Sequence, residues 1–219
     1  NLAWRMHEAG VENFGKEGAD ELPVEHPKPD EILVRVDAIG ICFSDVKLIT
    51  QGSTHPRITG RDLEKEPVTP GHEVSITVIE AGENYKDKYK PGDRFLVQAD
   101  VFYKGVNIAY GYALAGGMQQ YCTVEEPVLN GAEGSYLIPV SPETGYAEAA
   151  LVEPWTCVVA SYRIKPRKSL KPGGIALFCQ VEDGDFEIDP AICSNGAPEK
   201  IILSGLSEKI REQFCGSVE

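Results

Sequence analysis

Alternating hydrophobic and polar positions predict three β-strands in the first half of the chain. Residues 31–39 alternate a β-branched run with charged residues, as a half-buried strand does. Residues 74–80 repeat this alternation and lead into the turn signal Ala81-Gly82, and a third short run at residues 94–98 follows Pro91-Gly92-Asp93. Together these segments predict a small, barrel-like β domain with loops between its strands.

Residues 103–117 show no period and are rich in glycine, tyrosine and alanine. Such a segment predicts a long irregular loop, and loops of this length often carry function. Its aromatic residues, with Trp155 further along, are candidates for lining a pocket. Aromatic side chains in such positions more often serve packing.

The pattern changes after Tyr146, where residues 147–154 open a helical period and residues 155–162 continue it as an apolar run. Two strand-like apolar runs follow at residues 175–179 and 200–204, and residues 206–214 read as a helix. The order strand, crossover, strand, helix is typical of a parallel α/β domain. We therefore predict a boundary near Ser169, with one domain over residues 1–168 and a partial α/β segment over residues 169–219.

Composition and charge exclude some classes of partner. The chain has 219 residues, 42% of them hydrophobic and 25% charged, and a net charge of −13. This charge repels nucleic acid and anionic membranes, and no apolar run approaches the roughly 20 residues of a membrane-spanning helix. The six cysteines contain no Cys-x-x-Cys pair, so we expect reduced thiols, and without a secretory signal we expect a cytoplasmic location.

Cys42 and His72 are candidate metal ligands in predicted loops. A thiolate and an imidazole suit zinc, and a catalytic site uses three or four protein ligands. Glu73 and Glu153 could supply oxygen ligands. From the residues alone, however, Cys42 could equally be a small buried hydrophobe and His72 a solvated loop residue.

Four strings of residues change this balance. They are Gly-Ile-Cys-Phe-Ser-Asp-Val-Lys at 40–47, Pro-Gly-His-Glu at 70–73, Tyr-Lys-Pro-Gly-Asp-Arg-Phe-Leu-Val at 89–97 and Leu-Val-Glu-Pro-Trp at 151–155. In order and spacing, residues 31–174 resemble the zinc-dependent medium-chain dehydrogenase/reductase family, in the glutamate form of sorbitol and other polyol dehydrogenases. The resemblance implies a mainly β GroES-like barrel domain, α+β overall, followed by a partial Rossmann-like segment.

The resemblance also implies a ligand set. Cys42, His72 and Glu153 match the zinc ligands, and Glu73 matches a fourth or exchanging ligand that takes part in catalysis. Residues 100–121 contain no cysteine, so we expect no second, structural zinc of the four-cysteine type that many family members carry.

Ser44 and Asp45 match two catalytic residues of the family. The resemblance implies that the Ser44 hydroxyl relays a proton from the substrate alcohol and that the Asp45 carboxylate orients the ligand imidazole. The alternative is structural, because a Ser-Asp pair commonly forms a turn or caps a helix.

The cofactor-binding residues are not identified by the sequence. Members of the family hold NAD or NADP at a glycine-rich turn after the first strand of the nucleotide-binding domain. Here the turn after residues 175–178 has a single glycine, Gly184, among five acidic residues within residues 182–189. Carboxylates repel a pyrophosphate at close range.

The resemblance implies a zinc-dependent oxidoreductase that interconverts an alcohol and a carbonyl on a polyol, sugar or sugar phosphate with NAD(P). It also implies a homo-oligomer, a dimer or tetramer, with a small-molecule substrate. Two alternatives remain: a catalytically silent zinc-binding or assembly module that has lost the cofactor, and a protein in which Cys42 and His72 are packing residues without metal.

Overall fold

The computed structural model describes residues 1–163, 169–180 and 188–213. The chain divides into two compact units, Asn1–Val159 and Ala160–Glu219. Each is described here by itself, and the boundary expected near Ser169 stays a prediction.

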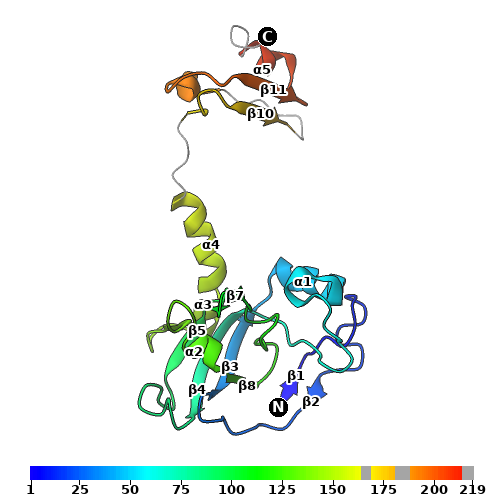
Figure 1. The fold of residues 1–219 in the computed structure, drawn as a ribbon, viewed down its shortest axis with the longest axis vertical. Helices are drawn as coiled ribbons and strands as arrows, with labels where there is room; N and C mark the ends of the chain where they lie inside the picture. Colours follow the sequence, from blue (N-terminus) through cyan, green and yellow to red (C-terminus); the bar gives the residue numbers. More distant parts are fainter. Residues whose placement is uncertain (164–168, 181–187, 214–219) are drawn as a thin grey trace. The chain divides into compact units, whose positions relative to one another are not determined.

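An antiparallel sheet of five strands forms the centre of the first unit (Figure 1). Its order is β8 (Tyr121–Val124), β3 (Ile32–Gly40), β4 (Glu73–Ala81), β5 (Arg94–Val97) and β9 (Leu137–Pro139). The three strands predicted from alternation are confirmed as β3, β4 and β5. The long pair β3–β4 runs from Ile32 opposite Ala81 to Gly40 opposite Glu73, and its register shifts twice, after Leu33 and after Val36.

The sheet does not close into the barrel that the sequence predicts. Among the described residues β8 pairs with β3 alone and β9 with β5 alone, so that the two outer strands remain edges. Closure needs paired edges, and β8 and β9, of four and three residues, do not pair with each other.

Two hydrophobic clusters stabilise the first unit. One face of the sheet contributes the larger cluster, in which alternate residues of β3 and β4 such as Ile32, Val34, Ile76 and Val78 are fully buried. The second cluster lies under a helix, α1 (Phe43–Gln51), and joins Leu48 and Ile49 to Met6, Ile58, Leu63, Val68, Ala109 and Tyr112. Burial of these apolar side chains is the main force that holds the sheet and helix α1 in place.

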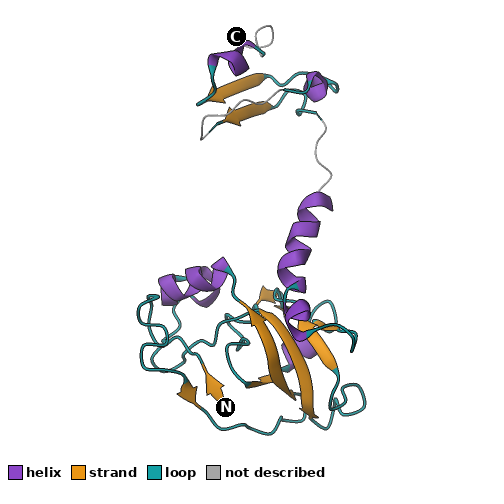
Figure 2. Ribbon diagram, turned by 180° about the vertical axis from the view of Figure 1, so that it is seen from behind, coloured by secondary structure: helices purple, strands orange, loops and turns teal. Residues whose placement is uncertain are grey.

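Helix α1 begins directly after Cys42, so the expectation that Cys42 lies in a loop is confirmed, and the helix is an element that the sequence analysis did not predict. Cys42 is the residue that caps the N-terminus of α1. The helix buries Asp45, Leu48 and Ile49, which share one face at the i, i+3, i+4 spacing. It continues into 3₁₀ turns at Gly52–Thr54 and Pro56–Ile58, and Figures 1 and 2 show α1 beside the N-terminal segment, where Gly10 N donates to Ile49 O over 2.8 Å.

Short elements complete the first unit. Strands β1 (Leu2–Ala3) and β2 (Asp20–Glu21) pair with each other, and so do β6 (Phe102–Tyr103) and β7 (Val106–Asn107). The segment predicted as an irregular loop therefore begins with a small hairpin and is otherwise irregular. Helix α2 (Glu126–Leu129) follows β8.

Helices α3 (Tyr146–Ala150) and α4 (Val152–Arg163) confirm the predicted helical segment, with a break at Leu151.

In the second unit β10 (Ile175–Cys179) and β11 (Lys200–Ser204) pair in parallel over five residues. A 3₁₀ turn, Pro190–Cys193, precedes β11, and α5 (Glu208–Glu212) follows it, so the predicted order of elements is found. Gly184 and Glu182, Asp183, Asp185 and Glu187 lie outside the described residues. In the part of the chain that the structure describes, none of the helices has the length and hydropathy to cross a membrane.

Candidate metal centre

Three of the predicted ligands come together where β3 leads into α1 and where β4 begins. One ligand atom each from Cys42, His72 and Glu73 lies within 4.8 Å of the other two, and no other such group of three occurs among the described residues. His72 and Glu73 are buried and Cys42 is half-buried. We call these three residues the metal cluster.

The β3–β4 register makes room for the Glu73 carboxylate. Gly40 pairs with Glu73, and a Cβ atom at position 40 would overlap Glu73 Oε2 and lie 3.1 Å from Glu73 Cβ. The glycine is therefore required by a close approach rather than by its backbone conformation.

Asp45 is fully buried and connects the two segments that carry the ligands. Its Oδ2 accepts a hydrogen bond of 2.9 Å from Cys42 N, and its Oδ1 accepts one of 3.2 Å from Gly71 N. Oδ1 also lies 3.4 Å from His72 Nδ1. The carboxylate thus closes the capping box of α1 and also faces the imidazole of His72. Its role in orienting that imidazole stays a prediction.

The charge around His72 is strongly negative. Burial lowers the pKa of His72, but the adjacent Asp45 carboxylate, with the charge of Glu153, outweighs it and raises the pKa to about 9. Nδ1 is buried and faces Asp45 without hydrogen-bond geometry, and Nε2 lies 3.4 Å from Ser44 Oγ. A thiol, an imidazole and a carboxylate in such a field match the donor set that zinc prefers.

Glu153 lies near the metal cluster but is not one of its three residues. It occupies the first turn of α4 and is half-buried. Burial raises the pKa of Glu153, the charge of His72 lowers it, and Glu73 and Asp100 raise it. Its carboxylate is therefore within electrostatic range, and its role as a ligand stays a prediction.

A stack of two aromatic rings lies beside the imidazole: Tyr112, one of the aromatic residues of the irregular loop that the sequence makes pocket candidates, and His55, which the sequence analysis did not assign. The Tyr112 ring lies 5.9 Å from the His72 ring between centroids, and the His55 ring stacks on Tyr112 at 5.4 Å. Burial raises the pKa of Tyr112, and a hydrogen bond with the Ser44 side chain lowers it in part. Nothing in the aperiodic sequence of residues 103–117 distinguishes Tyr112 from its neighbours.

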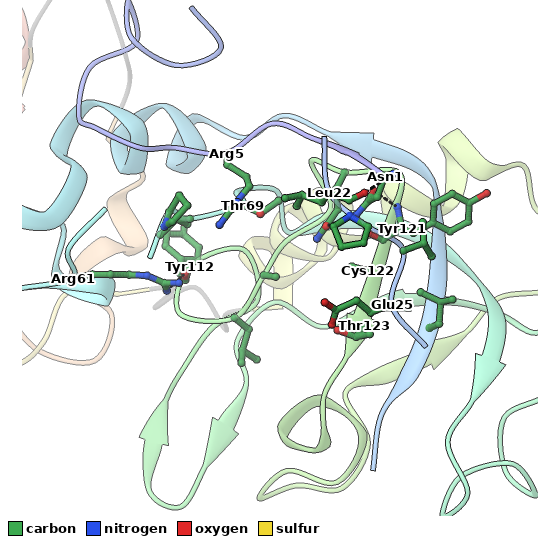
Figure 3. A pocket seen from close by; sticks show the side chains of 18 residues that line it. Asn1, Arg5, Leu22, Glu25, Arg61, Thr69, Tyr112, Tyr121, Cys122 and Thr123 are labelled. Atoms are coloured by element: carbon green, nitrogen blue, oxygen red, sulfur yellow. Dashed lines mark hydrogen bonds between the residues drawn. The ribbon is translucent and has the colours of Figure 1, made fainter. Parts of the chain in front are cut away.

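A separate cavity of about 320 Å³ lies on another side of Tyr112 (Figure 3). Its walls include Asn1, Arg5, Arg61 and Cys122 but none of the metal cluster. The predicted site residues therefore do not line this cavity.

Comparisons with known proteins agree with this geometry. The family model described as the alcohol dehydrogenase GroES-like domain matches residues 28–159. Over 82% of its length the chain is 33% identical to the uncharacterized protein YggP of Escherichia coli K12 and 31% identical to the mannitol-1-phosphate 5-dehydrogenase of Aliivibrio fischeri. It spans 44% of the length of each of these relatives.

A similar fold occurs in the solved structure of a cobalt- and zinc-bound thermostable alcohol dehydrogenase from Pyrobaculum aerophilum. The TM-score is 0.54 at 21% sequence identity, and the match covers 81% of this chain and 51% of that one.

Proposed function

Because the chain belongs to the zinc-dependent medium-chain dehydrogenase/reductase family, we propose that it carries the zinc site of an alcohol dehydrogenase that acts with NAD or NADP. The substrate is a polyol, a sugar or a sugar phosphate, and the reaction interconverts an alcohol and a carbonyl. The family's glutamate-type third ligand and the similarity to a mannitol-1-phosphate 5-dehydrogenase support this class of substrate.

The observation that carries the proposal is the metal cluster. Cys42, His72 and Glu153 from α4 would hold the zinc, with Glu73 as a fourth or exchanging ligand. The proximity of Cys42, His72 and Glu73 and the electrostatic range of Glu153 support this set. When bound, zinc supplies a Lewis acid that lowers the pKa of a substrate alcohol.

Residues of the chain itself would position the imidazole and move the proton. Asp45 would orient His72 through the charge of Oδ1, which lies 3.4 Å from Nδ1, and this would leave Nε2 for the ligand position. The Ser44 hydroxyl lies 3.4 Å from His72 Nε2 and hydrogen-bonds Tyr112. Ser44 is thus placed to accept a proton from an alcohol held at the metal cluster.

The silent zinc-binding or assembly module is the second candidate. Its support is the single glycine, Gly184, at the turn where relatives of this family bind the dinucleotide. Such a module retains zinc and has no affinity for NAD(H) or NADP(H). The domain of residues 1–168, the Rossmann-like character of residues 169–219, the cytoplasmic location and the homo-oligomer stay proposals.

Elemental analysis of zinc tests the proposal first. Protein purified without chelator should contain about one zinc per chain, and Cys42→Ala should lose it. Cys193→Ala, a thiol of the second unit, is the matched control and should keep it. Titration with NAD(H) and NADP(H) then separates the two candidates: binding supports the dehydrogenase, and zinc without binding supports the silent module. Wild-type protein without zinc would contradict both.

A further inference from the structure

Arg57 lies one aromatic ring away from the metal cluster. Its guanidinium carbon is 4.9 Å from the centroid of the Tyr112 ring, and the same ring lies beside His72. Arg57 Nη2 forms an ion pair of 2.8 Å with Asp100, whose charge in turn affects Glu153. The guanidinium is therefore held in a fixed place at the edge of the candidate site.

The guanidinium retains unused hydrogen-bond donors. Asp100 occupies Nη2, and among the described residues Nε and Nη1 of Arg57 make no hydrogen bond. The Arg57 side chain is 37% exposed, so a ligand can reach it. A planar guanidinium with free N–H donors on Nε and Nη1 suits the oxygens of a phosphate.

A second cation, Lys47, acts on the same histidine as Arg57. Lys47 projects from α1, with its Nζ 5.4 Å from the centroid of the Phe43 ring, and it has no ion-pair partner within the described part of the chain. Burial lowers the pKa of His55, and the positive charges of Arg57 and Lys47 lower it further. Both cations therefore act on the same imidazole.

We propose that Arg57, assisted by Lys47, is a phosphate-binding subsite that selects a phosphorylated polyol or sugar over the unphosphorylated compound. This inference rests on the proposed function. A neutral polyol needs no cation for recognition, whereas a phosphate does. The chain as a whole has a net charge of −13. Lys47 has no ion-pair partner in the described part of the chain and Arg57 has one, Asp100. These two positive charges near the candidate active site therefore favour an anionic substrate.

The carboxylates nearby orient such a substrate. Glu153 lies within electrostatic range of His72 and Glu73, and its carboxylate repels a phosphate from the metal cluster. Asp100 instead pairs with Nη2 of Arg57 and leaves the other donors of the guanidinium for the phosphate. The phosphate is thereby directed to Arg57 and Lys47, and a hydroxyl-bearing carbon at the other end of the molecule is directed to Cys42, His72 and Glu73.

Calorimetric titration of the zinc-loaded full chain tests the subsite without requiring turnover. The probes are mannitol 1-phosphate, mannitol, NAD(H) and NADP(H), because the cofactor is the other source of phosphate. The variants are Arg57→Gln, Arg57→Lys, which keeps the charge, and Lys47→Met. Lys88→Gln is the matched control, since Lys88 lies 5.0 Å over the Tyr89 ring outside the site.

The wild type should bind mannitol 1-phosphate at least about tenfold more tightly than mannitol. Arg57→Gln should remove this preference and leave mannitol binding unchanged, with smaller losses for Arg57→Lys and Lys47→Met and none for Lys88→Gln. Equal affinities in the wild type would overturn the proposal. So would a loss in Arg57→Gln that affects only the cofactor.

Zinc content measured on the same samples separates this proposal from the proposed function. Wild-type protein without zinc contradicts the dehydrogenase itself. Zinc-loaded protein that does not distinguish the two polyols contradicts only the phosphate subsite.

Discussion

Gly40 and Glu73 face each other across the β3–β4 ladder, and the Glu73 carboxylate occupies the space that a side chain at position 40 would fill. One member of the metal cluster is therefore positioned by a residue that has no side chain. The pairing register, rather than a hydrogen bond, makes this space available.

We predict that Gly40→Ala weakens zinc binding about tenfold, an effect of the size seen when a ligand's surroundings are changed. The new methyl group displaces the end of the Glu73 side chain, which can move without unfolding the sheet. Competition with a chromophoric chelator measures the affinity. Gly145→Ala is the control, because Gly145 also approaches a glutamate, Glu148, outside the metal cluster. Equal zinc affinities in the two variants would argue against the role of Gly40.

Asp45→Asn should weaken zinc binding by about 10–100-fold, because the amide no longer orients His72 with a negative charge. It should also lower the free energy of unfolding by about 1 kcal/mol, the usual value of a helix-capping contact. Chelator competition and urea denaturation measure the two effects. Asp93→Asn changes a carboxylate that accepts from Lys90 N in an exposed turn, and zinc affinity should not respond to it.

Gly71 precedes His72 with a φ of 95°, and a Cβ there would overlap Ile39 Cδ1 and lie 3.1 Å from Met118 Cγ. Gly71→Ala should therefore cost more than the about 1 kcal/mol of backbone strain expected at a left-handed position. Gly60→Ala isolates the strain, since Gly60 has a φ of 79° and open space around it. If urea denaturation gives both variants the same loss of stability, packing around Gly71 contributes nothing.

Cys122 should make the fold sensitive to alkali. Burial raises the pKa of its thiol to about 11, although a hydrogen bond with Tyr110 lowers it in part. Above pH 9 the unfolded chain releases this proton while the folded chain keeps it, so stability falls as pH rises from about 9 to about 11. The loss reaches roughly 3 kcal/mol.

Urea denaturation at pH 8, 9 and 10 measures this loss. Cys122→Ala should show a shallower decline with pH than the wild type, whatever its stability at pH 8. Cys193→Ala, in the second unit, should decline as the wild type does. A Cys122→Ala curve parallel to that of the wild type would assign the alkaline sensitivity to other groups, among them Tyr110, whose pKa burial also raises.

Alternation along the chain predicted β3, β4 and β5, because each buries one face in the core. Helix α1 was missed: its sequence is rich in β-branched residues, and the Asp45 cap and the burial of Leu48 and Ile49 stabilise it. The burial of Leu48 and Ile49 depends on residues far along the chain.

Sequence patterns likewise predicted some residues of the site and missed others. Strings of residues that resemble the zinc-dependent family identified Cys42, His72 and Glu73, which the fold brings together. Tyr112 and Arg57 have no such string. Tyr112 lies beside His72 and Arg57 lies over Tyr112 because α1, the turns that follow it and the irregular loop pack together. Residues that only tertiary packing brings to the site could not be predicted from the sequence.

The buried Asp45 carboxylate has a consequence for how metal enters. It binds the backbone of both ligand-bearing segments through Cys42 N and Gly71 N, so the distance between these segments is set by contacts within the protein. The site is thus preorganised, and little conformational entropy is lost when an ion arrives. Uptake and release of the metal can then proceed as local exchange, without folding and unfolding of the domain.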